Sequence, residues 1–252
     1  MEIILENKDR SISLNSDNVI GINKKISVSK LINSKYSIKI DKQKKSKKEL
    51  NDYKKFISYI EENPNFIPFK SNIYEIMYYE IRSKNIILNN PAKKMKDSLK
   101  IVGLNKDYLE RNLHNLSTSE KKLFQLSLAL LSNPNILILE EPFKYLDFDK
   151  KKKLMILLKK MKDDYNKTII IISNNSNILY KYTDNVLLFK NNKLLIEGKS
   201  KEIFENISFL EKNNIELPES ILFTKKAIDK KNVNMDYHRD IRDLIKDIFK
   251  HV

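Results

Sequence analysis

Residues 131–147 read LSNPNILILEEPFKYLD, and the ILIL segment within them (136–139) is an apolar run with no polar alternation. A run of this kind predicts a strand that is buried on both faces, as the strands of parallel sheets are. Glu140 and Glu141 follow directly, and ligands of such sheets collect at the carboxyl ends of the strands. The stretch therefore predicts a buried strand that presents two carboxylates to a ligand.

Helical and strand patterns alternate on both sides of this strand. Upstream, SEKKLFQLSLALLSNP predicts a helix that either Ser117 or Ser119 can cap. Downstream, DKKKKLMILLKKMKDD carries apolar residues at i, i+3, i+4 and i+7, as an amphipathic helix does. TIIIIS (168–173) then predicts a second buried strand, rich in β-branched residues. This alternation indicates an α/β protein with a parallel sheet.

Further elements are expected nearer the two ends of the chain. MEIILEN and NVIGIN are short apolar runs typical of strands, and VLLFK followed by LLIEGK predicts a hairpin. Tyr78, Tyr79 and Phe124 stand at helical spacings and are expected in the core. From about residue 205 the pattern changes, and DKKNVNMD is typical of a linker. The last helix places Ile241, Leu244, Ile245 and Ile248 on one apolar face, which is suited to packing within the chain or to dimerisation.

The composition narrows the classes of partner. The chain has 252 residues, a net charge of +15 and no cysteine, so disulfides and thiolate chemistry are excluded. The abundant lysines fit nucleic acid or an anionic membrane surface, but they also fit solvated helix faces. No aromatic-interleaved basic motif is present, so nucleic acid is not expected as a partner. No apolar run approaches the roughly 18–20 residues of a membrane-spanning helix.

The order and spacing of these segments resemble the ATP-binding subunit of an ABC transporter, most of all the ATPase subunits of energy-coupling factor (ECF) transporters. LSTSE stands where that family has its LSGGQ signature, ILILEEP resembles Walker B, and FKYLD resembles the D-loop. YIEENPNF resembles the Q-loop, TIIIISNN the strand before the switch histidine, and EKNNIELPESI the tail motif of ECF ATPases. The resemblance implies a P-loop NTPase-like nucleotide-binding domain, with a mixed, mainly parallel sheet. That domain would span residues 1–204, with a helical subdomain at about 63–133, and a small helical extension would span residues 205–252.

The segment that resembles Walker A departs from the GxxxxGK[ST] pattern. From Gly21 it reads GINKKISV, with Ile26, Ser27 and Val28 in place of glycine, lysine and hydroxyl. Charge-assisted hydrogen bonds contribute roughly 1.5–3 kcal/mol each, so these changes together cost several kcal/mol of nucleotide binding. The resemblance implies ATP and Mg²⁺ as cofactors, and the sequence predicts weak ATP binding at the chain's own site. The candidate phosphate-binding residues are Gly21, Asn23, Lys24, Lys25, Ser27 and Lys30.

The other family positions are partly retained. By the resemblance, Glu141 is the catalytic carboxylate, Glu140 the Mg²⁺ position and Asp147 the D-loop aspartate. Asn174 replaces the switch histidine and offers no titration near neutral pH. Glu62 replaces the Q-loop glutamine and adds a negative charge near any triphosphate. The signature residues, which would face the ATP of a partner subunit, are Ser117, Thr118, Ser119 and Glu120.

The function implied is that of an ECF-type subunit for vitamin or metal uptake, acting as a catalytically impaired, pseudo-ATPase half of a heterodimer. The implied partners are a second ABC ATPase subunit, a transmembrane scaffold subunit and a substrate-binding membrane subunit, and the implied location is the cytoplasmic face of the cell membrane. One alternative is an active ABC ATPase that binds ATP through Lys24, Lys25 or Lys30. Another is a soluble ABC relative that acts on nucleic acid or the ribosome.

Overall fold

The computed structural model describes residues 3–6, 11–14, 18–23, 37–40, 43–44, 57–63, 72–191, 193–231 and 235–250. The chain forms two compact units. Unit 1 comprises Met1–Asp17 with Lys35–Ile170, and unit 2 comprises Asn18–Ser34 with Ile171–Val252. The division falls inside strand β8 (Thr168–Ile172), which therefore contributes residues to both units.

The main sheet is mixed and mainly parallel, as the sequence predicts. In unit 1, β6 pairs in parallel with β7, with Ile60 opposite Leu139. In unit 2, β3 pairs in parallel with β9, and β9 forms an antiparallel hairpin with β10. Four consecutive residues of β7 and all five of β8 are buried, which confirms strands covered on both faces. The strand order is β10 (Lys193–Lys199), β9 (Asn185–Lys190), β3 (Val19–Ile22), β8, β7 (Ile136–Glu140) and β6 (Ile57–Ile60).

A second, antiparallel sheet is formed by short strands of unit 1. β1 pairs with both β2 and β4, and β4 also pairs with β5. The order is β2 (Ser11–Leu14), β1 (Ile3–Glu6), β4 (Ser37–Ile40) and β5 (Gln43–Lys44).

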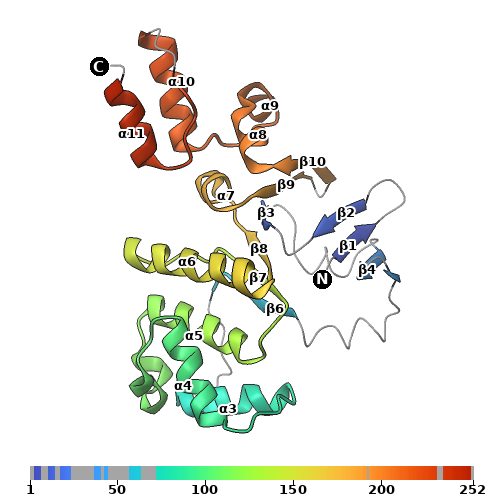
Figure 1. The fold of residues 1–252 in the computed structure, drawn as a ribbon, viewed down its shortest axis with the longest axis vertical. Helices are drawn as coiled ribbons and strands as arrows, with labels where there is room; N and C mark the ends of the chain where they lie inside the picture. Colours follow the sequence, from blue (N-terminus) through green and yellow to red (C-terminus); the bar gives the residue numbers. More distant parts are fainter. Residues whose placement is uncertain are drawn as a thin grey trace. The chain divides into compact units, whose positions relative to one another are not determined.

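The helices of unit 1 begin at polar caps. Asn72, Asn90, Ser117 and Asp147 each accept a hydrogen bond from a backbone N–H of the first turn, as Asn, Ser and Asp caps do. The sequence allowed either Ser117 or Ser119 to cap the helix that begins at Thr118, and in the structure Ser117 is the cap. These caps precede α3 (Ile73–Ser83), α4 (Pro91–Ile101), α5 (Thr118–Leu131) and α6 (Phe148–Tyr165), and the short 3₁₀ helices η1 (Lys106–Glu110) and η2 (Leu113–Asn115) lie between α4 and α5. Helices α3, α4 and α5 pack against one another (Figure 1).

One expectation about the core of unit 1 is wrong. Phe124 is fully buried, but Tyr78 and Tyr79 are each 41% exposed. The buried face of α3 is instead formed by Ile73, Ile76, Met77 and Ile81, and it leaves the two tyrosines on the outer side. The spacing of apolar residues could not separate these two faces, because both carry large side chains.

Unit 2 contains the remaining helices: α7 (Ser176–Tyr182), α8 (Ser200–Glu205), α9 (Ile207–Lys212), α10 (Glu219–Lys231) and α11 (Ile241–Lys250). The expected boundary between residues 204 and 205 falls inside α8. On the apolar face of α11, Leu244 is buried, whereas Ile241 is 63% exposed and Ile245 44% exposed. Within the described part of the chain, no helix is long and apolar enough to cross a membrane.

Candidate functional site

Glu140 stands at the carboxyl end of β7, where its side chain is held by Tyr59 of β6 and by Glu62, two residues after β6. The hydroxyl of Tyr59 donates a hydrogen bond to Glu140 Oε2 (2.8 Å), and the backbone N–H of Glu62 donates to the same oxygen (3.2 Å). Burial, and then this hydrogen bond to the carboxylate, raise the pKa of Tyr59. The structure thus brings together two positions that the sequence analysis selected, Glu140 and Glu62.

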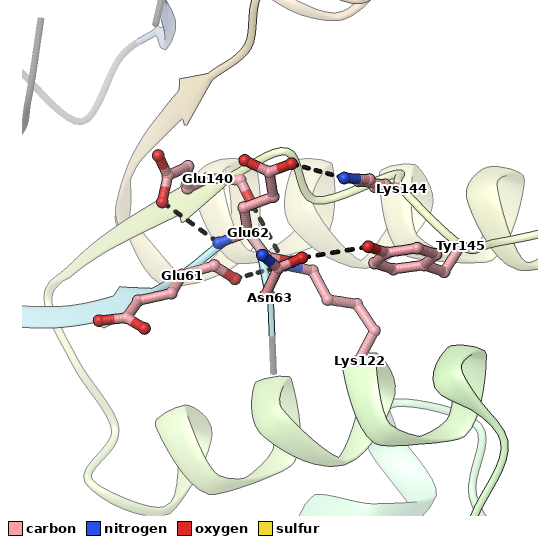
Figure 2. Close-up of polar contacts among 7 residues, drawn as sticks. All are labelled: Glu61, Glu62, Asn63, Lys122, Glu140, Lys144 and Tyr145. Atoms are coloured by element: carbon pink, nitrogen blue, oxygen red, sulfur yellow. Dashed lines mark hydrogen bonds and ion pairs between the residues drawn. The ribbon is translucent and has the colours of Figure 1, made fainter. Parts of the chain in front are cut away.

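The carboxylate of Glu62 is paired with a residue from the turn after β7. Lys144 Nζ lies 2.6 Å from Glu62 Oε1, and the next residue, Tyr145, bonds through its hydroxyl to Asn63 Oδ1 (3.1 Å) (Figure 2). The side chain of Lys144 is 43% exposed, so this ion pair contributes at most about 1 kcal/mol. Its consequence is local: the negative charge of Glu62 already has a partner within the chain.

Lys122 was not selected from the sequence, yet it lies at the centre of this cluster. It stands in the second turn of α5 and is 3% exposed. Its Nζ donates to the carbonyl oxygens of Glu61 (2.6 Å), Glu62 (2.9 Å) and Glu140 (3.2 Å). A lysine ammonium has three donors, so all three are used on the main chain. We call this group of four residues the Lys122 junction (Figure 2).

A signal for Lys122 was available in the sequence. Lys122, Leu126 and Ala129 stand at i, i+4 and i+7 and are all buried, so the lysine lies on the apolar face of its helix. A charged residue at such a position requires buried partners. The identity of those partners was not accessible, because they are main-chain atoms 18 to 61 residues away.

Glu141 and Asp147 take part in the turns after β7. Glu141 has φ of 43°, a left-handed conformation that is uncommon for residues other than glycine, and its carbonyl accepts from the N–H of Lys144 (3.1 Å). Asp147 caps α6 through the N–H of Lys150 (2.8 Å) and also pairs with Lys150 Nζ (2.7 Å). The hydrogen bond from the lysine side chain, above all, lowers the pKa of Asp147.

The signature-like residues form the first turn of α5. Ser117 and Glu120 make a capping box, in which Ser117 Oγ accepts from the N–H of Glu120 and Glu120 Oε2 accepts from the N–H of Ser117 (2.8 Å). The hydroxyl of Tyr108 donates to Glu120 as well, and it is the main cause that lowers the pKa of Glu120. Ser117 and Thr118 are exposed. The hydroxyl of Ser119 is buried and finds no hydrogen-bond partner among the residues that the structure describes.

The Walker A-like residues that are described, Gly21 and Asn23, make contacts within unit 2. The Asn23 side chain accepts from the N–H of Phe189 (2.7 Å) and donates to its carbonyl (2.9 Å), so it extends the pairing of β3 with β9. A Cβ on Gly21 would lie 2.8 Å from Thr183 Oγ1. Lys24, Lys25, Ser27 and Lys30 lie outside the described residues.

Asn174 follows β8 and is exposed at a cavity of unit 2 of about 540 Å³. Residues from the end of β3, from α7, from β9 and from the segment before α10 complete the lining: Asn23, Ser176, Leu179, Leu188, Asn214, Ile215 and Glu216. The structure therefore describes two separate sets of candidate residues, Glu62 with Glu140 in unit 1, and Asn23 with Asn174 in unit 2. No group of three or more His, Cys, Asp or Glu residues in the described ranges is arranged to hold a metal ion.

Comparison with known proteins gives one family model and many relatives. The model described as ABC transporter matches residues 25–144. The energy-coupling factor transporter ATP-binding protein EcfA2 of Mycoplasma mobile is 26% identical over 213 residues, which cover 84% of this chain and 68% of that protein.

Solved structures give the same picture of the fold. CbiO1 of Clostridium perfringens, described as part of the ABC transporter complex cbiONQ, has a TM-score of 0.67 at 22% identity and covers 89% of this chain and 98% of its own. The dimeric ATP-binding cassette MJ0796, in a post-hydrolysis state bound to ADP and Pi, has a TM-score of 0.66 at 18% identity, over 79% of this chain and 98% of its own. At these identities the likeness concerns the fold.

Proposed function

The chain belongs to the ABC transporter family over its residues 25–144 and has the fold of ABC nucleotide-binding cassettes, and on that premise we propose that it is the ATP-binding-cassette subunit of an energy-coupling factor transporter. The EcfA2 relative, which aligns with most of the chain, supports this assignment. The tail segment EKNNIELPESI supports it as well, because it resembles the tail of that group of ATPases.

We propose further that the chain is the catalytically impaired half of a heterodimer. The observation that carries this proposal is the state of Glu140, whose carboxylate accepts hydrogen bonds from Tyr59 and from the N–H of Glu62. Mg²⁺ requires oxygen ligands in a nearly ideal octahedron. Oε2 of Glu140 already accepts both bonds, so it would have to release one of them to become a ligand. The loss of the Walker A pattern at Ile26 and Ser27 supports the same conclusion.

ATP and Mg²⁺ are the ligands of the intact family, and Glu140 and Glu141 are the residues that would face them from unit 1. Bound Mg²⁺ would neutralise charge that develops on the phosphates. Glu141 would orient and polarise a water molecule, as a carboxylate after a buried strand can. Ser117 and Thr118, exposed at the start of α5, would face nucleotide held by the second ATPase subunit.

In this proposal the chain works at the cytoplasmic face of the cell membrane as a peripheral subunit. Its partners are the second ATPase subunit, a transmembrane scaffold subunit and a substrate-binding membrane subunit. The second ATPase subunit supplies the Walker A residues that this chain lacks, and the present chain maintains the dimer and transmits its movement to the scaffold.

Titration of the purified full chain with a fluorescent ATP analogue and Mg²⁺ tests the impaired site. We expect no saturable binding below about 1 mM, equivalent to less than about 4 kcal/mol of binding free energy. Glu141→Gln is titrated beside it, since it removes one negative charge without changing the shape, and the same result is expected. Saturation at micromolar nucleotide would contradict an impaired site.

Co-expression of a tagged chain with a second ATPase and a scaffold subunit tests the assembly. We expect all three to co-purify, and we expect Glu141→Gln in this chain to leave the phosphate release of the complex within about twofold of the wild type. The same substitution at the matching carboxylate of the second ATPase is expected to abolish it. Recovery of the chain with neither subunit would remove the transporter assignment.

A second candidate function is that of an active ABC ATPase, and the retention of Glu141 directly after β7 favours it. In that case phosphate release by the chain alone would fall at least about 100-fold in Glu141→Gln, as general base catalysis contributes about 10²–10⁴-fold. Phosphate release that is unaffected by this substitution would exclude the candidate.

A further inference from the structure

We propose that Lys122 is a positioning residue that holds the segment 61–63 against the end of β7 and the start of α5 without nucleotide or metal. The inference rests on the proposed function, because it concerns how the Q-loop position of an impaired ABC subunit is controlled. Its consequence is that the segment around Glu62 keeps one conformation whether or not ATP is present.

The local backbone is shaped for this contact. Successive residues of a strand point their groups to opposite sides, yet the carbonyls of both Glu61 and Glu62 accept from the same Lys122 ammonium, at 2.6 Å and 2.9 Å. They can do so because the chain leaves β6 after Ile60 and bends at Glu62 and Asn63. The third carbonyl, that of Glu140, ends the neighbouring parallel strand.

The junction joins three parts of the chain that are distant in sequence. Lys122 belongs to α5, whose first turn carries Ser117 and Glu120, while the carbonyls belong to the ends of β6 and β7. A buried ammonium is costly unless its donors are satisfied, and here each donor has a carbonyl. Removing the ammonium leaves three carbonyls without this partner, so the arrangement is stable only with all its members in place.

Three further contacts, each of which involves at least one side chain, hold the same segment. Glu62 pairs with Lys144, Asn63 with Tyr145, and the N–H of Glu62 with the carboxylate of Glu140 (Figure 2). Two lysines therefore supply positive charge around Glu62 and Glu140: Lys122, which is buried, and Lys144, which is exposed.

The test is amide hydrogen exchange of the full chain at residues 61–63, with and without ATP and Mg²⁺. We expect exchange of the Glu62 amide to be slow in the nucleotide-free protein and to change less than twofold when nucleotide is added. In Lys122→Met, which has a side chain of similar length and no charge, we expect exchange at 61–63 to rise about tenfold or more. Lys121→Met is the matched control, one residue away on the same helix, and no change is expected.

A general loss of stability is separated from a positioning role by where exchange rises. The positioning role predicts a rise confined to 61–63 and to the turn after β7, with unit 2 unchanged. If Lys122→Met folds and exchange at 61–63 stays as in the wild type, the inference is overturned. If Lys122→Met does not fold, Tyr59→Phe, at a position that is 42% exposed, replaces it. It removes one of the two hydrogen bonds to Glu140 Oε2, and it is expected to speed exchange of Glu62.

The wild-type comparison stands without any variant. Fast exchange of Glu62 in the nucleotide-free protein, or a slowing of tenfold or more on addition of ATP and Mg²⁺, overturns the inference. Micromolar ATP binding with unchanged exchange at Glu62 would remove the impaired-site proposal and leave the Lys122 junction standing. If ATP does not bind and the Glu62 amide exchanges fast, the impaired-site proposal stands and the Lys122 junction is overturned.

Discussion

Gly21 lies in β3 with residues of α7 and the turn after it packed directly on its Cα, so a side chain has no room there. A Cβ would lie 2.8 Å from Thr183 Oγ1 and 3.0 Å from Leu179 Cδ2. Overpacking of this kind costs about 1–3 kcal/mol, and we expect Gly21→Ala to lower the free energy of unfolding by that amount. Urea denaturation of the wild type and the variant measures it.

Thr183→Ala supplies the control for this prediction, since it removes the two nearest of the three side-chain atoms that the new methyl group would meet. The double variant is expected to lose less stability than the sum of the two single variants, because the residues are in contact. Full additivity would contradict the packing role of Gly21. So would a Gly21→Ala variant of unchanged stability that differs from the wild type only in nucleotide binding.

Individual residues also show how far sequence reasoning reaches. The motifs of the site were visible because each is a local run, such as ILILEE or LSTSE. The partners of those residues were not visible, because Tyr59 contacts Glu140 and Lys144 contacts Glu62 only once β6 has paired with β7. Lys122 reaches the carbonyls of Glu62 and Glu140 from α5. Asn23 is similar: its place in a phosphate-loop motif gave no hint that its amide pairs with Phe189, 166 residues away.

The element that begins with the signature-like residues, α5, depends on a titrating side chain. The folded-state pKa of Glu120 is lowered from 4.5, mainly by the hydrogen bond from Tyr108. A lowered pKa contributes stability that is present above pH 4.5 and is lost as the pH falls through the folded value. We expect the urea midpoint to fall between pH 6 and pH 3 by more in the wild type than in Glu120→Gln, which keeps the capping box but does not titrate.

A matched variant separates this effect from general acid destabilisation. Tyr108→Phe removes the hydroxyl that lowers the pKa and leaves the capping box in place, so its pH dependence should be intermediate. Equal acid sensitivity in the wild type, Glu120→Gln and Tyr108→Phe would show that Glu120 does not govern the stability of α5 at low pH.

Among the elements, those with one dominant physical cause were predicted and those with competing causes were not. β7 and β8 are apolar throughout, and α5 has both a capping box and an apolar face, so their nature followed from the sequence. On α3 the tyrosines compete with Ile73, Ile76, Met77 and Ile81 for the core, and only tertiary packing decides. On α11, Leu244 is buried and Ile241 is exposed, and the periodicity of apolar residues cannot predict which of the two is buried.

At the scale of the whole molecule, the segment before α11 contacts α7 and the residue that follows α7. Asp240 pairs with Lys181 (3.4 Å), and Arg239 makes two further contacts. Arg239 Nη1 donates to the carbonyl of Thr183 (3.3 Å), and its guanidinium lies 5.4 Å from the ring centre of Tyr180. A cation–π contact and a charged hydrogen bond together contribute about 2–4 kcal/mol. We expect Arg239→Ala to speed hydrogen exchange and proteolysis of residues 235–250, while exchange in unit 1 stays as in the wild type.

Arg242→Ala is the control for this attachment. Arg242 is 77% exposed, and it pairs with Asp240, two residues away in the same segment. We expect its removal to leave exchange of 235–250 within about twofold of the wild type. Similar acceleration by both arginine variants would contradict a specific role for Arg239, and acceleration that extends into unit 1 would indicate a general loss of stability and not a local one.

The packing of α7 on Gly21 also affects how the sequence of such a chain evolves. A glycine that a neighbouring helix requires is protected by selection for folding, and it would persist after selection for a ligand had ended. The amide of Asn23, committed to the β3–β9 pair, would persist for the same reason. Gly21 and Asn23, two surviving residues of a phosphate-loop motif, are therefore explained by packing and pairing within the fold, and their presence alone does not show that nucleotide is still bound.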